Sequence, residues 1–353
     1  MRVRRPQVGR APPIRAPGVR GPVPALRGPH RDGRLVAAAS VGDPAPMRID
    51  TRPLQPTATG TIPLGAPDDR GRRFVSAASG IAAGGNGTAW VVSDEMGALV
   101  RIDARGIGHL EPGLPPTKHR PDFESMLAAP SDDAAHGATM VFAAGSGSKD
   151  SRHRGVVQDI SAAGAPVGAP RMIDLGELHA RMATELPGGV NVEGMALHTA
   201  RSGASELVLL QREQDGDAPN RLFRVDGPSV LAALRDGAAI PARALLGSVP
   251  VDLGSLHGVR LGFADATALP DGRIAFAASA EAADGSILGS AIGMLDRDLR
   301  VTALRPLAGA PRKIEGIELA SRIDPTAAPT AFVLVTDPDD ADRATERLTV
   351  DLA

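Results

Sequence analysis

The sequence contains no cysteine and no tyrosine, and its only tryptophan is Trp90. The lack of cysteine excludes disulfides, thiolate catalysis and cysteine-ligated metals, so any metal must be held by Asp, Glu, His or carbonyl oxygen. No run of about 18 apolar residues occurs, and we therefore expect no membrane span. The net charge of −2 over 353 residues gives no strongly basic surface, so we expect no nucleic-acid partner. With 42% hydrophobic residues, the chain can bury a sizeable core.

The first 46 residues differ in composition from the rest of the chain. Residues 1–34 are rich in Arg, Pro and Gly, contain a single acid, Asp32, and show no hydrophobic periodicity. Such a segment cannot bury enough apolar surface to offset its ordering entropy, so we predict a disordered tail over residues 1–46, or a start codon placed too far upstream. The tail lacks the continuous apolar stretch of a signal peptide, and with no cysteine in the chain we expect a cytoplasmic protein. We predict that residues 47–353 form a single domain.

After Arg73 the chain consists of short apolar segments separated by Gly, Pro, Asp and Asn. One short element recurs along it. Its sequence is Glu-Gly followed by an apolar residue at Glu193 and Glu315, Glu-Ser at Glu124, and a weaker form at Asp265 and Ser79. Each copy opens a unit of about four short strands at intervals of roughly 45–70 residues, which is typical of β-propeller blades. We therefore predict an all-β propeller with five blades of four strands, or six blades if the long connections hide another.

The fifth unit ends one strand short. We predict that the N-terminal segment near Leu54–Leu64 supplies the missing strand and closes the ring, because an open sheet edge is a hazard in β architectures. Two segments break the strand pattern. Residues 175–186 have apolar positions at helical spacing and end before Pro187, and residues 228–235 are followed by Asp236-Gly237. We predict a short helix in each, between blades.

The acids of the recurring element are predicted to meet at one face of the propeller. The first strand of each blade lines the central channel, and the second strand returns to the face where the first began. The strand-one starts supply Glu124, Glu193, Asp265 and Glu315. The strand-two ends supply Asp94, Lys149, Arg152, Gln211, Arg212, Glu281 and Asp337. We therefore expect a charged site at the channel mouth.

Carboxylates that share a narrow axis raise one another's pKa unless something neutralises them. A Ca²⁺ ion, which takes six to eight oxygen ligands, would do so with the four strand-one acids as its ligands. Alternatively, the lysine and arginines of the strand-two ends would pair with the acids and leave a pocket for an anionic ligand. In a third interpretation, the acids bond to amides of neighbouring strands and only hold the ring together.

Several short motifs together resemble an uncharacterised bacterial family: Asp122-Phe-Glu-Ser, Gly145-Ser-Gly-Ser, Asn191-Val-Glu-Gly, Leu210-Gln-Arg, Gly262-Phe-Ala-Asp, Gly289-Ser-Ala-Ile-Gly, Lys313-Ile-Glu-Gly and Val335-Thr-Asp. Members of that family look like β-propellers distantly similar to the "esterase-like activity of phytase" proteins and to the calcium-dependent lactonase and gluconolactonase propellers. The resemblance covers about residues 72–353. In the lactonase propellers a Glu that opens the first strand of a blade binds the metal, which implies this role for Glu193, Glu315 and, with Ser following, Glu124. The lactonases' Asn and Asp ligands have no counterparts here that match in order.

These observations predict a monomeric protein that acts on or binds a small, anionic molecule. As an enzyme it would hydrolyse an ester, lactone or phosphoester, with Ca²⁺ polarising the substrate oxygen and one Glu as base. The catalytic residues would be Glu193, Glu315, Arg152 and Arg212. As a binding module it would hold an anionic ligand or a protein partner without turnover. In either case the ligand would contact Lys149, Gln211, Asp94, Glu281 and Asp337.

Overall fold

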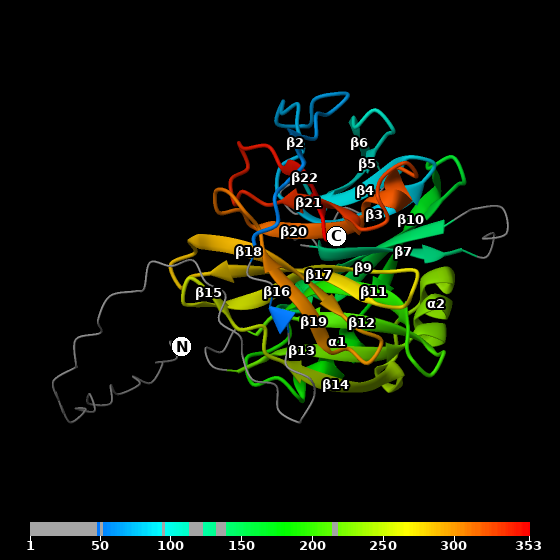
Figure 1. The fold of residues 1–353 in the computed structure, drawn as a ribbon. Helices are drawn as coiled ribbons and strands as arrows, with labels where there is room; N and C mark the ends of the chain where they lie inside the picture. The colour runs from blue at the N-terminus through cyan, green and yellow to red at the C-terminus, as the bar shows by residue number, and fades with distance from the viewer. Residues whose placement is uncertain (1–47, 50–51, 94–95, 113–122, 132–138, 214–217) are drawn as a thin grey trace, which may run out of the picture. The chain divides into compact units, whose positions relative to one another are not determined.

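The computed structural model describes residues 48–49, 52–93, 96–112, 123–131, 139–213 and 218–353. The tail predicted over residues 1–46 lies outside this part of the chain. The described residues form five antiparallel sheets, each built on four strands that follow one another in sheet order (Figure 1). Inner strands of neighbouring sheets contact one another all the way round. The predicted five-bladed β-propeller is therefore confirmed.

Each blade has one strand at each of four positions, counted outward from the central channel. The inner strands are β3 (Ala78–Gly85), β7 (Phe123–Pro130), β11 (Val192–Thr199), β16 (Val259–Ala268) and β20 (Ile314–Leu319). The second strands are β4 (Thr88–Ser93), β8 (Thr139–Gly145), β12 (Ser205–Gln211), β17 (Ile274–Glu281) and β21 (Ala331–Thr336). The third strands are β5 (Ala98–Ile102), β9 (Arg154–Ile160), β13 (Asn220–Asp226), β18 (Ile287–Leu295) and β22 (Glu346–Asp351). The outermost strands are β6 (Gly108–Glu111), β10 (Pro166–Asp174), β14 (Leu245–Val251), β19 (Val301–Pro306) and β2 (Ala58–Thr61).

The fifth blade is completed by the N-terminal strand, as the sequence predicts. β2 pairs antiparallel with β22, and Ala58 lies opposite Thr349. Two further short strands extend the fourth blade. β1 (Arg48–Ile49) runs parallel to β19 on the outside, and β15 (Ser255–Leu256) pairs with β16 on the inside. The N-terminal part of the chain thus joins two neighbouring blades.

Both predicted helices are present among the described residues. Helix α1 (Gly176–Ala183) lies between blades two and three, where it was expected. Helix α2 (Gly227–Asp236) begins at the N-cap Asp226, whose side chain accepts a hydrogen bond from the Ser229 amide, and ends at Gly237 in the left-handed conformation. It joins β13 to β14 and therefore lies within blade three, not between two blades. A third short helix, α3 (Ala320–Ile323), follows β20. None of the described helices has the length and apolar character that a membrane crossing needs.

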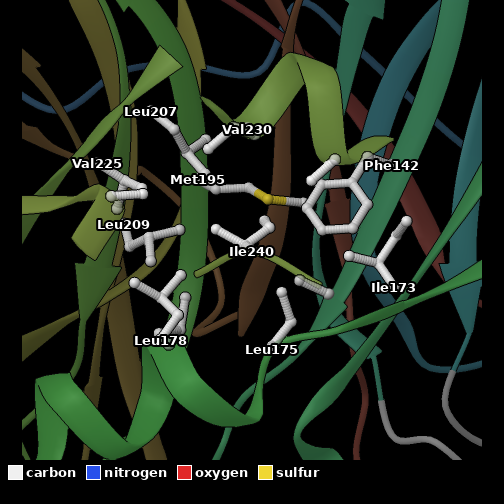
Figure 2. Close-up of a cluster of buried hydrophobic side chains, with 14 of the residues drawn as sticks. Phe142, Ile173, Leu175, Leu178, Met195, Leu207, Leu209, Val225, Val230 and Ile240 are labelled. Atoms are coloured by element: carbon white, nitrogen blue, oxygen red, sulfur yellow. The ribbon is translucent and has the colours of Figure 1, made fainter. Parts of the chain in front are cut away.

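Hydrophobic residues fill each of the interfaces between neighbouring blades. The interface of blades two and three is extended by α1 and α2, which contribute Leu178 and Val230 beside Met195 of β11 (Figure 2). Aromatic side chains are few, and close packing depends on glycine opposite them. A Cβ at Gly293 of β18 would overlap the ring of Phe276 on β17, so glycine is required there.

Candidate active site at the channel mouth

Every inner strand carries a β-bulge near its start. The pairing of inner and second strand skips one residue in all five blades, and the skipped residues are Ser79, Glu124, Glu193, Ala264 and Glu315. A bulge leaves one extra residue unpaired and changes the direction of its side chain. We call these five positions the bulge residues. Three of them are the glutamates of the recurring sequence element.

Asp265 does not belong to this set, which corrects its predicted alignment with the three glutamates. The bulge of β16 falls on Ala264, so Asp265 occupies the next position, equivalent to Gly194 and Gly316. Its side chain is fully buried, and its Oδ2 accepts a hydrogen bond from the Ile317 amide of the neighbouring blade at 2.9 Å. Burial raises the pKa of Asp265 well above the usual value, because the charged carboxylate loses its hydration there. Asp265 ties blade four to blade five and does not line the mouth with the glutamates.

The residues that follow the bulges form a ring around the axis, which we call the hub ring: Gly80, Ser125, Gly194, Asp265 and Gly316. Neighbouring inner strands are in close contact here. A Cβ at Gly194 would lie 2.8 Å from the Cα of Asp265, and a Cβ at Gly80 would lie 2.9 Å from the Met126 amide nitrogen. After Glu193 the backbone of the next blade occupies the space of a side chain at Gly194, and after Glu315 the Val335 side chain occupies it at Gly316.

Glu193 is held in place from two sides. Its Oε1 accepts a hydrogen bond from Asn191 Nδ2 at 2.6 Å and lies 3.5 Å from Arg212 Nη1. Gln211, predicted to contact a ligand, is buried instead and supports this arrangement. Its Oε1 accepts from the Asn191 amide at 2.7 Å, and its Nε2 donates to the carbonyl of Gly189.

Arg212 connects the glutamates of different blades. It follows β12, passes over Gly262, where a Cβ would lie 2.7 Å from its Nε, and reaches Glu281 at the end of β17. Burial alone would lower the pKa of Arg212, but Glu193, Glu315 and Glu281 outweigh it and raise the pKa, so the guanidinium stays charged. Among the described residues its Nη2 has no hydrogen-bond partner, although it lies 3.3 Å from Glu281 Oε2.

Glu315 is the most buried of the three glutamates. It is 3% exposed, and its Oε1 lies 3.4 Å from Lys313 Nζ without a hydrogen bond from any described residue. Burial, together with the negative charges of Glu193 and Asp337, raises the pKa of Glu315 to about 8 against the opposing effect of Lys313 and Arg212. The carboxyl group is therefore protonated at neutral pH, beside an arginine that stays charged.

Lys313 is a residue of this site that the sequence prediction did not include. It donates a hydrogen bond to Asp339 at 3.0 Å, and burial is outweighed by Glu315, Asp337 and Asp339, which raise its pKa. A signal for it was present in the sequence. A polar residue stands two positions before the glutamate in both Asn191-Val-Glu193 and Lys313-Ile-Glu315, and both contact that glutamate.

Blade two contributes a separate group of polar side chains. Arg152 Nη1 lies 3.8 Å from Glu124 Oε1 and donates a hydrogen bond to Ser148 Oγ at 2.9 Å. Lys149 is exposed at the start of the short 3₁₀ helix Asp150–Arg152. Asp94, also predicted to contact a ligand, lies outside the described residues.

The predicted calcium ligands do not fit a calcium ion. Ca²⁺ requires six to eight oxygen ligands around one point. The described residues contain no group of three or more His, Cys, Asp and Glu side chains that could hold a metal. Arg212 lies beside Glu193 and Lys313 beside Glu315, so cations occupy the space next to these acids. One carboxylate oxygen of Asp265 accepts a hydrogen bond from a backbone amide. The ion-pair interpretation describes the mouth better, and the structural interpretation describes Asp265.

A family model with the description "Family of unknown function (DUF6929)" matches residues 74–352, which is more than half of the chain. The chain belongs to this family. No curated protein matches the sequence. The matched range begins just before the first blade and includes every strand from β3 to β22.

Solved structures that are similar to this DUF6929 chain include propellers with different functions. The calcium-binding protein regucalcin from Agrobacterium tumefaciens is 13% identical with a TM-score of 0.39, over 84% of this chain and 96% of that one. Exo-β-1,3-galactanase from Phanerochaete chrysosporium is 9% identical with a TM-score of 0.48, over 84% and 65%. The gluconolactonase XC5397 from Xanthomonas campestris is 14% identical with a TM-score of 0.36, over 74% and 68%. The TM-scores all lie below 0.5, and no function follows from them.

Proposed function

We propose that the channel mouth hydrolyses an uncharged ester or lactone, with Glu315 as the general acid and Glu193 as the general base. The observation that supports this proposal is the difference between the two glutamates. Burial keeps Glu315 protonated at neutral pH, whereas Glu193 accepts a hydrogen bond from Asn191 and lies beside Arg212. Two carboxyl groups in such different surroundings, close to one cation, can exchange protons with a substrate in opposite directions.

In the proposed reaction Glu193 removes a proton from water, and the water oxygen attacks the carbonyl carbon of the ester. The bond between that carbon and the leaving oxygen then breaks, and the leaving oxygen takes the proton of Glu315. The products are a carboxylic acid and an alcohol, or one hydroxy acid from a lactone. Glu193 releases its proton to solvent and Glu315 takes one up, which restores the starting state.

Arg212 would stabilise the negative charge that develops on the carbonyl oxygen. Its guanidinium is buried and charged, and its Nη2 makes no hydrogen bond to any described residue. A donor held in a buried site before the reaction starts stabilises an oxyanion without reorganisation, and such donors contribute about 10²–10³ in kcat. In the proposed reaction Arg212 therefore stabilises the oxyanion without the help of a bound metal ion.

The charge of the mouth favours an uncharged substrate. Around Glu315 the carboxyl groups outnumber the cations, which are Arg212 and Lys313. Apart from Glu315 itself, the carboxyl groups are those of Glu193, Glu281, Asp337 and Asp339. A phosphoester would add one or two negative charges to this cluster and would be repelled.

The proposal is tested with the full chain on a panel of aryl esters, γ- and δ-lactones and an aryl phosphate. We expect turnover of an ester or lactone but not of the phosphate, and a fall of about 10²-fold or more in kcat/KM for Glu193→Gln. Glu124→Gln is the matched control, because Glu124 is also a bulge glutamate but is paired with Arg152 in blade two. Folded protein that hydrolyses no ester or lactone, or equal losses in both variants, would contradict the proposal.

A second candidate, anion binding without turnover, is favoured by the polar group of blade two. Arg152 and the hydroxyl groups of Ser146 and Ser148 lie together there, with Lys149 exposed nearby. This candidate predicts that wild-type protein binds a small carboxylate in calorimetry and that Arg152→Ala loses the binding, while no substrate in the panel is turned over. Absence of carboxylate binding would eliminate it.

A further inference from the structure

We infer that the opposite end of the channel is a second binding site, which takes a small uncharged molecule with an apolar body and one hydroxyl group. This inference does not depend on the proposed hydrolysis at the mouth. It rests on a cavity of about 200 Å³ that lies among the distal halves of the inner strands, beyond the hub ring.

The cavity is separate from the charged mouth. Its lining begins one residue after the hub ring, at Met126, Met195 and Ala266, and continues to Arg322 of α3. Within the hub ring the strands are too close to admit a side chain at Gly194, where a Cβ would meet the Cα of Asp265 at 2.8 Å. None of the charged residues of the mouth lines this cavity, and the hub ring lies between it and Glu315 along the inner strands.

The lining of the cavity is mixed. Its apolar residues include Leu127 and Leu197, and its polar residues, which we call the polar lining, are Thr139, Thr267, Glu318 and Arg322. Small-molecule sites usually combine apolar walls with a few polar groups that fix orientation, and the polar share is larger here. Such a lining favours a ligand with both an apolar and a polar part.

The polar lining carries no net charge that a ligand must neutralise. Glu318 is buried and accepts hydrogen bonds from Thr267 Oγ1 at 2.8 Å, from the Ala83 amide at 3.0 Å and from Arg322 Nη1 at 3.2 Å. Its carboxylate is therefore balanced by Arg322. A charged ligand would lose its hydration without finding a free counter-ion, so an uncharged ligand is favoured.

The polar lining keeps hydrogen-bonding capacity for one hydroxyl group of a ligand. Thr139 Oγ1 donates to the Ala129 carbonyl at 2.6 Å, which leaves its lone pairs as acceptors. Arg322 Nη2 carries two hydrogens and donates one to the Ala268 carbonyl at 2.6 Å. A ligand hydroxyl could donate to the threonine or accept from the arginine. The volume suits one ring, since an apolar cavity of about 150 Å³ is known to bind benzene.

The test uses benzyl alcohol as the probe and full-length protein with ¹³C-labelled leucine methyl groups. We expect saturable shifts at Leu127 and Leu197, and none at Leu348, which is buried in the core between blades four and five. Toluene, which lacks the hydroxyl group, should bind about fivefold more weakly. Shifts that do not saturate, or that spread equally to Leu348, would overturn the inference, and equal binding of toluene would overturn the polar half of it.

A variant that fills the cavity gives a second readout. Ala128 lines the cavity and is only half-buried, so Ala128→Leu should be accommodated and should weaken benzyl alcohol binding by about tenfold or more. Ala162→Leu, in an exposed turn after β9, is the matched control and should bind as wild type. Unchanged affinity in a folded Ala128→Leu protein would place the probe elsewhere. If that variant does not fold, the methyl shifts of the wild-type protein decide the question alone.

Discussion

The bulges of β20 and β16 have the same backbone pattern but place their carboxyl groups in different surroundings. In β20 the acid is the bulge residue, Glu315, and glycine follows it in the hub ring. In β16 alanine is the bulge residue, and the acid, Asp265, stands in the hub ring. A shift of one residue thus moves a carboxyl group from a cluster of charges at the mouth to a backbone amide between two blades. A carboxyl group thus lies beside other charged side chains in one blade and ties two blades together in the other.

The largest expected effect is a difference in kcat between variants of Glu315 and Asp265. Glu315→Gln should lower kcat by about 10²-fold or more, because the amide cannot donate a proton to the leaving oxygen. Asp265→Asn keeps the acceptor for the Ile317 amide and should retain most of the activity. Steady-state kinetics on any ester or lactone that the wild type hydrolyses would measure both. Comparable losses in the two variants would mean that the one-residue shift does not separate the roles.

The hub ring itself can be disturbed at the glycine that corresponds to Asp265. Gly194→Ala would place a Cβ 2.8 Å from the Cα of Asp265, and we expect it to lower the free energy of unfolding by about 2–3 kcal/mol. Gly60→Ala in β2 is the control, since no atom lies within 4 Å of its added Cβ, and it should change stability by less than about 0.5 kcal/mol. Urea unfolding gives both values, and equal stability of the two variants would show that the blades are not closely packed at the ring.

The two acids should also make stability depend on pH. The pKa of Glu315 rises from the usual 4.5 to about 8 in the folded chain, so between these values the folded state keeps a proton that the unfolded state releases. The free energy of unfolding should therefore fall with rising pH in this window, by up to about 1.4 kcal/mol per pH unit for one retained proton. Glu315→Gln should flatten this slope, and Asp265→Asn should also reduce it, because burial raises the pKa of Asp265 in the folded chain. Unfolding curves from pH 4 to pH 9 provide the measurement, and a wild-type stability that rises over this range would have the wrong sign.

The smallest expected effect is that of calcium. Because Arg212 and Lys313 pair with the glutamates of the mouth, neither a chelator nor added Ca²⁺ should shift the melting temperature. An ion bound at a hundred times its Kd would stabilise the folded state by about 2.7 kcal/mol, which thermal unfolding detects easily. A melting temperature that falls with chelator and recovers with Ca²⁺ would restore the metal interpretation.

The sequence predicts most of the fold because each strand is an apolar run bounded by turn residues. Five units of four strands are predicted and observed, and the closing strand β2 falls within the predicted segment. The recurrence of Glu193 and Glu315 also predicts that they lie at one face, where Glu193 pairs with Arg212 and Glu315 with Lys313, and both acids raise the pKa of Arg212. These predictions succeed because they depend only on the order of strands within a repeating unit.

The position of Asp265 could not be predicted in the same way. A bulge shifts the register by one residue, and whether it falls on Ala264 or Asp265 depends on the packing of β16 against β20 in the neighbouring blade. The placement of α2 was missed for a related reason, since a helix between the third and fourth strands leaves the same local pattern as one between blades. Both features are set by contacts between distant parts of the chain.

The pairing of β2 with β22 has a consequence for how the protein is made. Ala58 and Thr349 lie opposite each other in the fifth blade although almost the whole propeller separates them in sequence. During synthesis β2 emerges early and stays without its partner until β22 leaves the ribosome, while the four preceding blades can already pair internally. Such long-range pairings form slowly, and the waiting strand exposes an edge that can pair with another chain. We expect ring closure to be the last step of folding and the step at which newly made chains are most prone to aggregate.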